Sequence, residues 1–303
     1  MALVEWTRPL FSVGPPPAPN RRLAANARRL DRLGAALVIN NSRPERWWLS
    51  GEIVAEAARQ LASDGYFVLD GFQGADAGVL LRKSAEQAHA AGELTAGRVS
   101  GAAGHGLAGV FRGDVSAAFG VTNSTRPPLP MRRFVQSTDA LVYSLREHAA
   151  RTTSPVAGCS EDAGLQHTTW RSSSLMIACY PGNQSRYVRH TDNSCDAGVG
   201  ARCNGRRLTV IGYLNDRRSD PTDGAIRLFA AGPPTSEPLV DIEPLQDRLV
   251  TFWSDSRVPH EVLPSAFPRF AATLWYFDAI EAMRAEGALP LGASPWLHPV
   301  EAP

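Results

Sequence analysis

The pattern of apolar and polar positions divides the chain into a helical first part and a strand-rich second part. In the first part, three stretches repeat apolar residues at the spacing of an amphipathic helix, and each predicts a helix with one buried face. Ser50 precedes the first stretch, where its hydroxyl is a suitable N-cap. The predicted helices are residues 53–64, 75–91 and 135–150, and an apolar run at residues 65–70 predicts a strand.

The second part alternates short runs of apolar, β-branched and aromatic residues with turn residues. This spacing is typical of a sandwich or barrel of short strands. We therefore expect an α+β protein, mainly β with supporting helices, whose core is a double-stranded β-helix, or jelly-roll, with the helices against one face. The predicted strands are residues 175–180, 188–190, 207–214, 226–229, 248–253 and 270–277.

Composition sets the expected limits of the folded part. Residues 1–49 are rich in proline and arginine, which predicts a flexible arm with a short basic helix; an organelle transit peptide is the alternative. Residues 50–285 then form one domain with its β-rich core at residues 172–280, and residues 286–303 form a tail. Within the domain, residues 95–133 are rich in glycine and proline, which predicts a mobile segment.

Charge and cysteine content narrow the function classes. The 303 residues carry a net charge of +1, which gives no reason to expect nucleic-acid or membrane binding, and no apolar run is long enough to predict a transmembrane helix. Four cysteines without a Cys-x-x-Cys pair favour a reduced compartment, cytoplasmic or nuclear. Cys195 and Cys203 are interpreted as solvated thiols, with a disulfide or a zinc site as the alternative.

Three residues carry the candidate chemistry. His190 and Asp192 form a His-x-Asp pair, and residues i and i+2 of a strand point the same way, so both can reach one ion. His260, in a turn-rich stretch, supplies a third ligand. Two imidazoles and a carboxylate on one face of an ion are typical of non-haem Fe(II) oxygenases. A lone His-x-Asp pair is a weak signal, because a surface turn produces the same pattern.

The predicted strand at residues 270–277 strengthens this interpretation. With a period of two, Arg269 shares one face of the strand with Thr273 and Trp275. This face is otherwise made of apolar or small residues, and a cation on it is unfavourable unless it is paired. A carboxylate ligand would pair it; an edge-strand arginine that reaches solvent is the alternative. Tyr213, on another strand, can donate its hydroxyl to the same carboxylate or can be a core tyrosine.

Several longer segments follow one another in a specific order. They are residues 176–183, 187–193, 213–215, 241–244, 247–249, 252–255, 259–262 and 273–278. Over this region the chain resembles the catalytic domain of the hypoxia-inducible-factor prolyl hydroxylases, the Egl-nine type of 2-oxoglutarate oxygenase. The resemblance implies the jelly-roll fold and an iron centre at its open end.

The resemblance also implies roles for single residues. His190, Asp192 and His260 match the iron ligands of the family. Arg269 matches the residue that grips the distal carboxylate of 2-oxoglutarate, and Tyr213 matches the tyrosine that also binds it. The residues that match the lining of the co-substrate pocket are Met176, Tyr180, Ile211, Ile226, Thr273 and Trp275, with Ile226 in place of the usual leucine.

A candidate substrate loop follows from the same resemblance. Arg206 matches an arginine that in the family pairs with an aspartate of this loop, and Arg112-Gly-Asp114 resembles the loop itself. We therefore expect Asp114 to pair with Arg206, with all three charged residues near the substrate. The departures from the family are Val115–Ala118 in place of Lys-Ile-Thr-Trp, Gly212 in place of an aromatic residue, and a longer insert at residues 195–204.

The activity that the resemblance implies is hydroxylation of C4 of a prolyl residue in a protein substrate. Bound Fe(II) would be the cofactor, 2-oxoglutarate and O2 would be consumed, and succinate and carbon dioxide would be released. Ascorbate would keep the iron reduced. The resemblance also implies a role in oxygen sensing. We expect a monomer with a protein or peptide partner and no nucleic-acid or membrane partner. The alternatives are an oxygenase for a different residue or a small molecule, and a jelly-roll binding module without activity.

Overall fold

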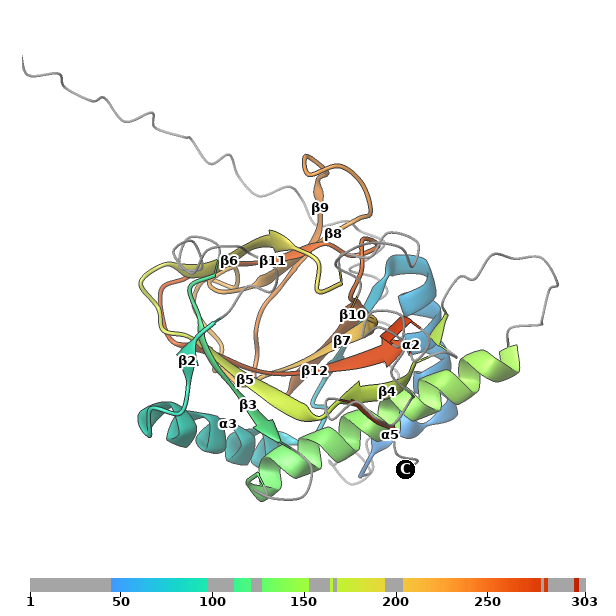
Figure 1. The fold of residues 1–303 in the computed structure, drawn as a ribbon, viewed down its shortest axis with the longest axis horizontal. Helices are drawn as coiled ribbons and strands as arrows, with labels where there is room; N and C mark the ends of the chain where they lie inside the picture. The colour runs from blue at the N-terminus through green and yellow to red at the C-terminus, as the bar shows by residue number, and fades with distance from the viewer. Residues whose placement is uncertain are drawn as a thin grey trace, which may run out of the picture.

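Figure 1 gives the fold of the chain as a computed structural model. The structure describes residues 45–97, 112–120, 127–152, 164–165, 168–193, 204–278, 281–282 and 297–299. Residues 1–44, most of the predicted tail, and three of the four cysteines (Cys159, Cys195 and Cys203) lie outside the described residues, so the predictions for them stay predictions.

Two antiparallel sheets face each other and enclose the core (Figure 1). In the larger sheet the strand order is β1-β10-β7-β12-β5-β3-β2, with β4 beside β12 and β13 beside β4; in the smaller sheet it is β6-β11-β8-β9. This arrangement confirms the predicted jelly-roll. The strands of the larger sheet are β1 (Tyr66–Asp70), β2 (Thr95–Ala96), β3 (Val115–Gly120), β4 (Thr168–Ser172), β5 (Ser174–Tyr180), β7 (Arg206–Tyr213), β10 (Arg248–Trp253), β12 (Arg269–Asp278) and β13 (Leu297–Pro299); those of the smaller sheet are β6 (Ser185–His190), β8 (Ile226–Phe229), β9 (Pro238–Ile242) and β11 (His260–Ser265).

Helices pack against the outer face of the larger sheet (Figure 1). Their apolar faces are buried as the helical periodicity predicts, and the hydroxyl of Ser50 accepts the N–H of Ile53 at 3.4 Å, which confirms the predicted N-cap. Trp47 and Trp48 are also buried, with Trp48 against Phe72, so packing begins before residue 50. The helical elements are η1 (Trp47–Leu49, a 3₁₀ turn), α2 (Gly51–Asp64), α3 (Ala75–Ala90) and α5 (Leu129–Thr152).

Gly212 lets helix α5 approach the larger sheet closely. A Cβ atom at this position of β7 would lie 2.5 Å from Cε2 of Phe134, which projects from α5. Because side chains alternate between the faces of a strand, Gly212 faces the helix while Ile211 and Tyr213 face the interior between the sheets. The departure from the family at this position therefore concerns helix packing and leaves the inner face of β7 unchanged.

A buried ion pair also ties α5 to the larger sheet. Nε of Arg171, in β4, donates to Oδ2 of Asp139 at 2.6 Å, and the hydroxyl of Tyr276, in β12, donates to Oδ1 at 2.8 Å. All three side chains are buried. The carboxylate is thus satisfied by a charge and a hydroxyl from two neighbouring strands, which fixes how α5 crosses them.

The structure differs from the sequence prediction in several places, and long-range strand pairing explains those that concern strands. The third helix begins at Leu129, before the predicted start at residue 135. Residues 115–120, inside the segment predicted to be mobile, form β3 because they pair with β5 along its whole length. His260, predicted to lie in a turn, is the first residue of β11, which pairs with β6 and β8.

We predict that Arg171→Met lowers the free energy of unfolding by about 3–5 kcal/mol, because it leaves the buried Asp139 carboxylate without its guanidinium. The measurement is urea unfolding followed by tryptophan fluorescence. Arg217→Met is the control: Arg217 pairs with Glu243 at 3.3 Å but its side chain is 72% exposed, and loss of such a pair costs about 0–1 kcal/mol. Equal losses of unfolding free energy in the two variants would contradict the stabilising role assigned to the Arg171–Asp139 ion pair.

Candidate metal centre and co-substrate pocket

His190, Asp192 and His260 meet at one end of the space between the sheets. His190 is the last residue of β6, and His260 pairs with it across the sheet as the first residue of β11. Nε2 of each imidazole lies 3.8 Å from an oxygen of Asp192. One potential ligand atom of each residue lies within 4.8 Å of the others, which is a suitable spacing for three ligands of one ion.

Both imidazoles present Nε2 to this centre because Nδ1 is engaged elsewhere. Nδ1 of His190 donates to the carbonyl of Val188 at 2.8 Å, and Nδ1 of His260 faces the carbonyl of Val258 at 3.4 Å. Such outer contacts set the tautomer of metal-binding histidines. Burial, followed by the neighbouring His260, lowers the pKa of His190 to about 3, and burial also lowers the pKa of His260. The rings are therefore neutral, as metal ligands must be.

Asp192 is an ionised carboxylate with one oxygen already oriented. Its Oδ2 accepts the Thr209 hydroxyl at 2.6 Å and the Trp275 indole N–H at 3.0 Å, whereas Oδ1 accepts no hydrogen bond from the described residues. Burial opposes ionisation, but the two histidines, Arg206 and the Thr209 hydroxyl together hold the pKa of Asp192 below its usual value. Oδ1 is thus the oxygen that is available to a cation.

Aromatic rings hold the imidazoles in place. Tyr187 stacks on His190 with 3.7 Å between ring centroids and 18° between planes, and Phe252 lies 4.6 Å from the ring of His260. Sequence reasoning assigned no role to Tyr187 or to Thr209. Thr209 shares the inner face of β7 with Ile211 and Tyr213, so the period-two pattern was the signal that could have identified it.

Arg269 occupies the opposite part of the same cavity, which has a volume of about 1200 Å³. Its side chain is 2% exposed, its Nε donates to the carbonyl of Gly224 at 2.7 Å, and its guanidinium lies about 5 Å from the ring centroids of Tyr180 and Tyr213. No carboxylate of the described residues pairs with it. A buried cation in this position requires an anionic ligand.

The Tyr213 hydroxyl is a second unsatisfied group beside Arg269. It is buried and has no hydrogen-bond partner among the residues that the structure describes. Burial raises the pKa of Tyr213, so the hydroxyl stays protonated and can donate. A guanidinium and a phenol hydroxyl on neighbouring residues fit a carboxylate, and the triad in the same cavity as Arg269 fits a metal ion. A dicarboxylate such as 2-oxoglutarate suits both sites.

Strand register brings the other predicted pocket residues to this cavity. In β12, Arg269 pairs with Tyr180, and Thr273 pairs with Met176 of β5 and Ile211 of β7. Tyr213 and Asp114 are not among the residues that line the cavity, but each contacts an arginine that does. The predicted residues that line the cavity are Arg112, Met176, Tyr180, His190, Asp192, Arg206, Ile211, Ile226, His260, Arg269, Thr273 and Trp275.

The predicted pair between Asp114 and Arg206 does not form in this structure. Arg112 binds the Asp114 carboxylate through two nitrogens, at 2.5 and 2.9 Å, because the two residues are neighbours on one side of the chain entering β3. Asp114 is buried, so this local pair satisfies it fully. Arg206 instead lies over the Trp275 ring, 4.0 Å from its centroid, with its charge toward Asp192.

Comparison with known proteins identifies the family. Residues 175–277 match the 2OG-Fe(II) oxygenase superfamily. Over 223 residues the chain is 34% identical to human prolyl hydroxylase EGLN3, a match that covers 73% of this chain and 82% of that relative. The chain belongs to the Egl-nine prolyl hydroxylase family. It is accordingly a 2-oxoglutarate-dependent dioxygenase of the prolyl hydroxylase type, and its family uses Fe(II), 2-oxoglutarate and O2.

Other members of the family match over shorter segments. Human Egl nine homolog 1 is 47% identical over 112 residues, which is 37% of this chain but 24% of that relative. Among solved structures, a prolyl hydroxylase from Trichoplax adhaerens in complex with a hypoxia inducible factor peptide fragment has a TM-score of 0.61 and 27% identity. The match covers 77% of this chain and 93% of that chain.

Among the described residues, no helix is long and apolar enough to cross a membrane.

We predict that Arg269→Ala raises the 2-oxoglutarate concentration needed for half-maximal turnover by about 10–100-fold, because it removes charge-assisted hydrogen bonds worth about 1.5–3 kcal/mol. The measurement is succinate formation against 2-oxoglutarate concentration. Arg269→Lys keeps the charge without the planar guanidinium, so its 2-oxoglutarate requirement should lie between those of the wild type and Arg269→Ala. An unchanged 2-oxoglutarate requirement in Arg269→Ala would rule out the role of this residue.

Proposed function

We propose that this protein hydroxylates C4 of a prolyl residue in a protein or peptide substrate, with 2-oxoglutarate and O2 consumed and succinate and carbon dioxide formed. The observation that carries the proposal is that one cavity holds both the triad and the buried Arg269, a cation with which no carboxylate of the described residues pairs. Family membership supplies the reaction class, and ascorbate is proposed as the reductant that keeps the iron active.

The proposed iron ligands are His190, Asp192 and His260. Fe(II) held there would supply the open coordination positions and the redox chemistry that activates O2. Around the ion, the chain's own residues would orient the ligands and exclude water. Thr209 and Trp275 hold one oxygen of Asp192, so the other keeps its direction toward the ion.

The proposed co-substrate site lies between the ion and Arg269. Arg269 and the Tyr213 hydroxyl would bind the distal carboxylate of 2-oxoglutarate, leaving its keto acid end toward the triad. Tyr180 and Thr273 would flank the molecule, and the apolar side chains of Met176, Ile211 and Ile226 would exclude water from the wall of the pocket. Exclusion of water strengthens each charged contact inside the site.

A polypeptide substrate agrees with the size and chemistry of the cavity entrance. The cavity exceeds the needs of a small dicarboxylate, and Arg112, Arg189 and Arg206 are among its lining residues. The Trichoplax relative is described in complex with a peptide. A protein substrate whose hydroxylation reports oxygen supply is our proposal for the biological role. Arg206 and the Arg112–Asp114 pair are proposed to contact this substrate.

The target sequence is proposed to differ from that of the relatives. Ser116, Ala117 and Ala118 of β3 line the cavity where the family has larger residues, including a tryptophan. Smaller side chains at this wall leave more room next to the substrate. The matched co-substrate residues and the altered β3 wall together suggest conserved chemistry with a different peptide preference.

A monomer in a reducing compartment completes the proposal. Every residue assigned to the metal, to 2-oxoglutarate and to the substrate comes from one chain, so a second copy is not required for the site. The cytoplasm or the nucleus is the proposed location, since the four cysteines include no Cys-x-x-Cys pair.

The experiment is succinate formation from 2-oxoglutarate by purified protein with Fe(II) and ascorbate, with and without a panel of proline-containing peptides. We expect one peptide motif to stimulate turnover and to gain one oxygen atom on proline. Turnover stimulated by a small molecule, or oxygen on another residue, would replace the prolyl substrate. Bound iron without any turnover would favour a binding module.

We predict that His190→Ala and His260→Ala each reduce succinate formation to the level of an enzyme-free control, because two protein ligands do not hold iron in the required geometry. His148→Ala, on α5, is the matched control and should retain full turnover. Turnover at the wild-type level in either ligand variant would contradict the iron assignment.

A further inference from the structure

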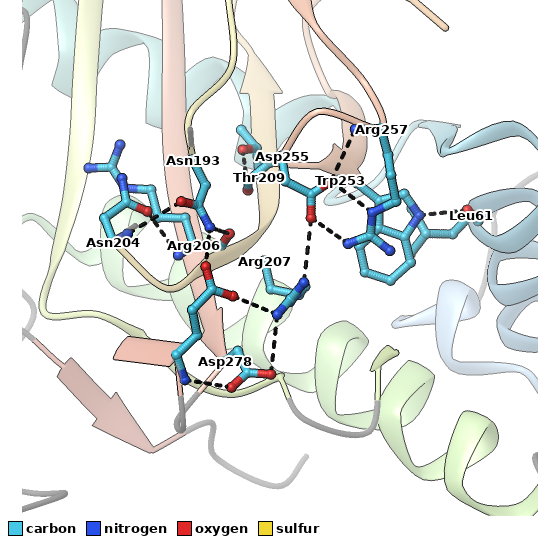
Figure 2. A network of polar contacts seen from close by, with 12 residues as sticks. Leu61, Asn193, Asn204, Arg206, Arg207, Thr209, Trp253, Asp255, Arg257 and Asp278 are labelled. Atoms are coloured by element: carbon cyan, nitrogen blue, oxygen red, sulfur yellow. Dashed lines mark hydrogen bonds and ion pairs between the residues drawn. The ribbon is translucent and has the colours of Figure 1, made fainter. Parts of the chain in front are cut away.

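A cluster of polar side chains surrounds Arg207 and includes Asn193, the residue that follows Asp192 in the chain (Figure 2). It consists of Asn193, Arg207, Asp255, Asp278 and Glu281, which we call the Arg207 network. None of these residues is among those that line the cavity. The cluster therefore lies outside the wall of the proposed co-substrate and substrate site, which leaves its role unexplained by the proposed function.

Arg207 is the centre of this network. Its Nη2 donates to Glu281 Oε2 at 2.6 Å and lies 3.4 Å from Asp278 Oδ2, while Nη1 lies 3.5 Å from Asp255 Oδ2. The side chain is 11% exposed. One guanidinium thus joins the start of β7, the end of β12, Glu281, and the loop between β10 and β11 (Figure 2). A partly buried ion network of this kind is rigid, because each carboxylate is held by charge and geometry.

Glu281 connects Arg207 to Asn193, the residue that follows the proposed iron ligand Asp192. Nδ2 of Asn193 donates to Glu281 Oε1 at 2.7 Å and to the carbonyl of Arg206 at 2.9 Å. Its main-chain N–H donates to the carbonyl of Ser254 at 2.9 Å. Asn193 is 1% exposed. Its side chain and its backbone are therefore both fixed in the interior.

The main chain of Asp192 is held by the same group of contacts. Nδ2 of Asn204 donates to the carbonyl of Asp192 at 2.8 Å, and the N–H of Asn204 donates to Oδ1 of Asn193 at 3.3 Å. Asn193 and Asn204 thus join the two ends of the longer insert. The position of Asp192 is consequently determined by residues that the structure describes on either side of the insert.

We propose that Asn193, Glu281 and Arg207 are positioning residues that set the place of the Asp192 carboxylate relative to the two imidazoles. The inference rests on the proposed function only in taking Asp192 as a metal ligand. Partners in the outer shell of a metal site orient its ligands, and their loss typically weakens metal affinity or activity by about 10–100-fold. The network also joins the ligand to the end of β12, the strand that carries Arg269.

The test is titration of the apo protein with Co(II), followed by visible absorption, without 2-oxoglutarate, O2 or peptide. We expect Asn193→Ala and Arg207→Met to raise the Kd for Co(II) by about 10–100-fold and to change the absorption spectrum. Arg207→Lys preserves the positive charge beside Glu281 and should recover most of the affinity. Glu281→Gln, which keeps its shape, is the second variant should either of the first two fail to fold, and it should also bind Co(II) more weakly.

The matched control is Arg171→Met, which removes a buried guanidinium from Asp139 of α5, a carboxylate outside the Arg207 network. We expect it to lower the melting temperature but to leave the Kd and spectrum unchanged. If the network variants lower the melting temperature and bind Co(II) as the wild type does, the network is merely structural and the inference is overturned.

The same titration separates this inference from the proposed function. Weak Co(II) binding in the network variants, with no proline hydroxylated by the wild type, would retain the positioning role and overturn the function. Failure of the wild type to bind Co(II) would overturn both, because Asp192 would then be no ligand.

Discussion

The ionised carboxylate of Asp192 inside the protein is the constraint on which the site depends. A buried carboxylate is unfavourable unless hydrogen bonds and positive charge compensate it. Here Thr209 and Trp275 donate to it, the two imidazoles face it, and Arg206 lies close enough to favour its charge. These partners come from β6, β7, β11 and β12. The two sheets must therefore close on each other before the charge is tolerated, which makes the candidate metal centre a product of the whole jelly-roll.

Charge at the other end of the cavity complements this centre. Arg269 is a buried cation that no described carboxylate neutralises, and the Tyr213 hydroxyl beside it has no hydrogen-bond partner in the described part of the chain. The protein thus presents an anionic triad and a cationic pocket, separated by apolar side chains on opposed strands. A metal ion and a dicarboxylate would satisfy both ends together, so the binding of each favours the binding of the other.

Predictions from sequence succeeded where the signal was local and periodic. The period-two pattern of residues 269–275 correctly placed Arg269, Thr273 and Trp275 on one cavity-facing side, and the helical pattern correctly placed α2 and α3. They failed where distant pairing decides. β3 was predicted to be mobile because it lies within residues 95–133, a segment rich in glycine and proline, and it forms because it pairs with β5. His260 was placed in a turn for the same reason, since β6 and β8 determine where β11 begins.

The sequence by itself determined the chemical inventory: two histidines, an aspartate and an arginine in a mainly β protein, in an order typical of one enzyme family. The tertiary structure decided which groups pair. In this structure Asp114 pairs with Arg112, Arg206 lies over the ring of Trp275, and Arg207 lies among three carboxylates. The reason is physical. Backbone periodicity fixes the face on which a side chain lies, whereas the partner of a buried charge depends on register, depth and the nearest competing ion, which chain order does not encode.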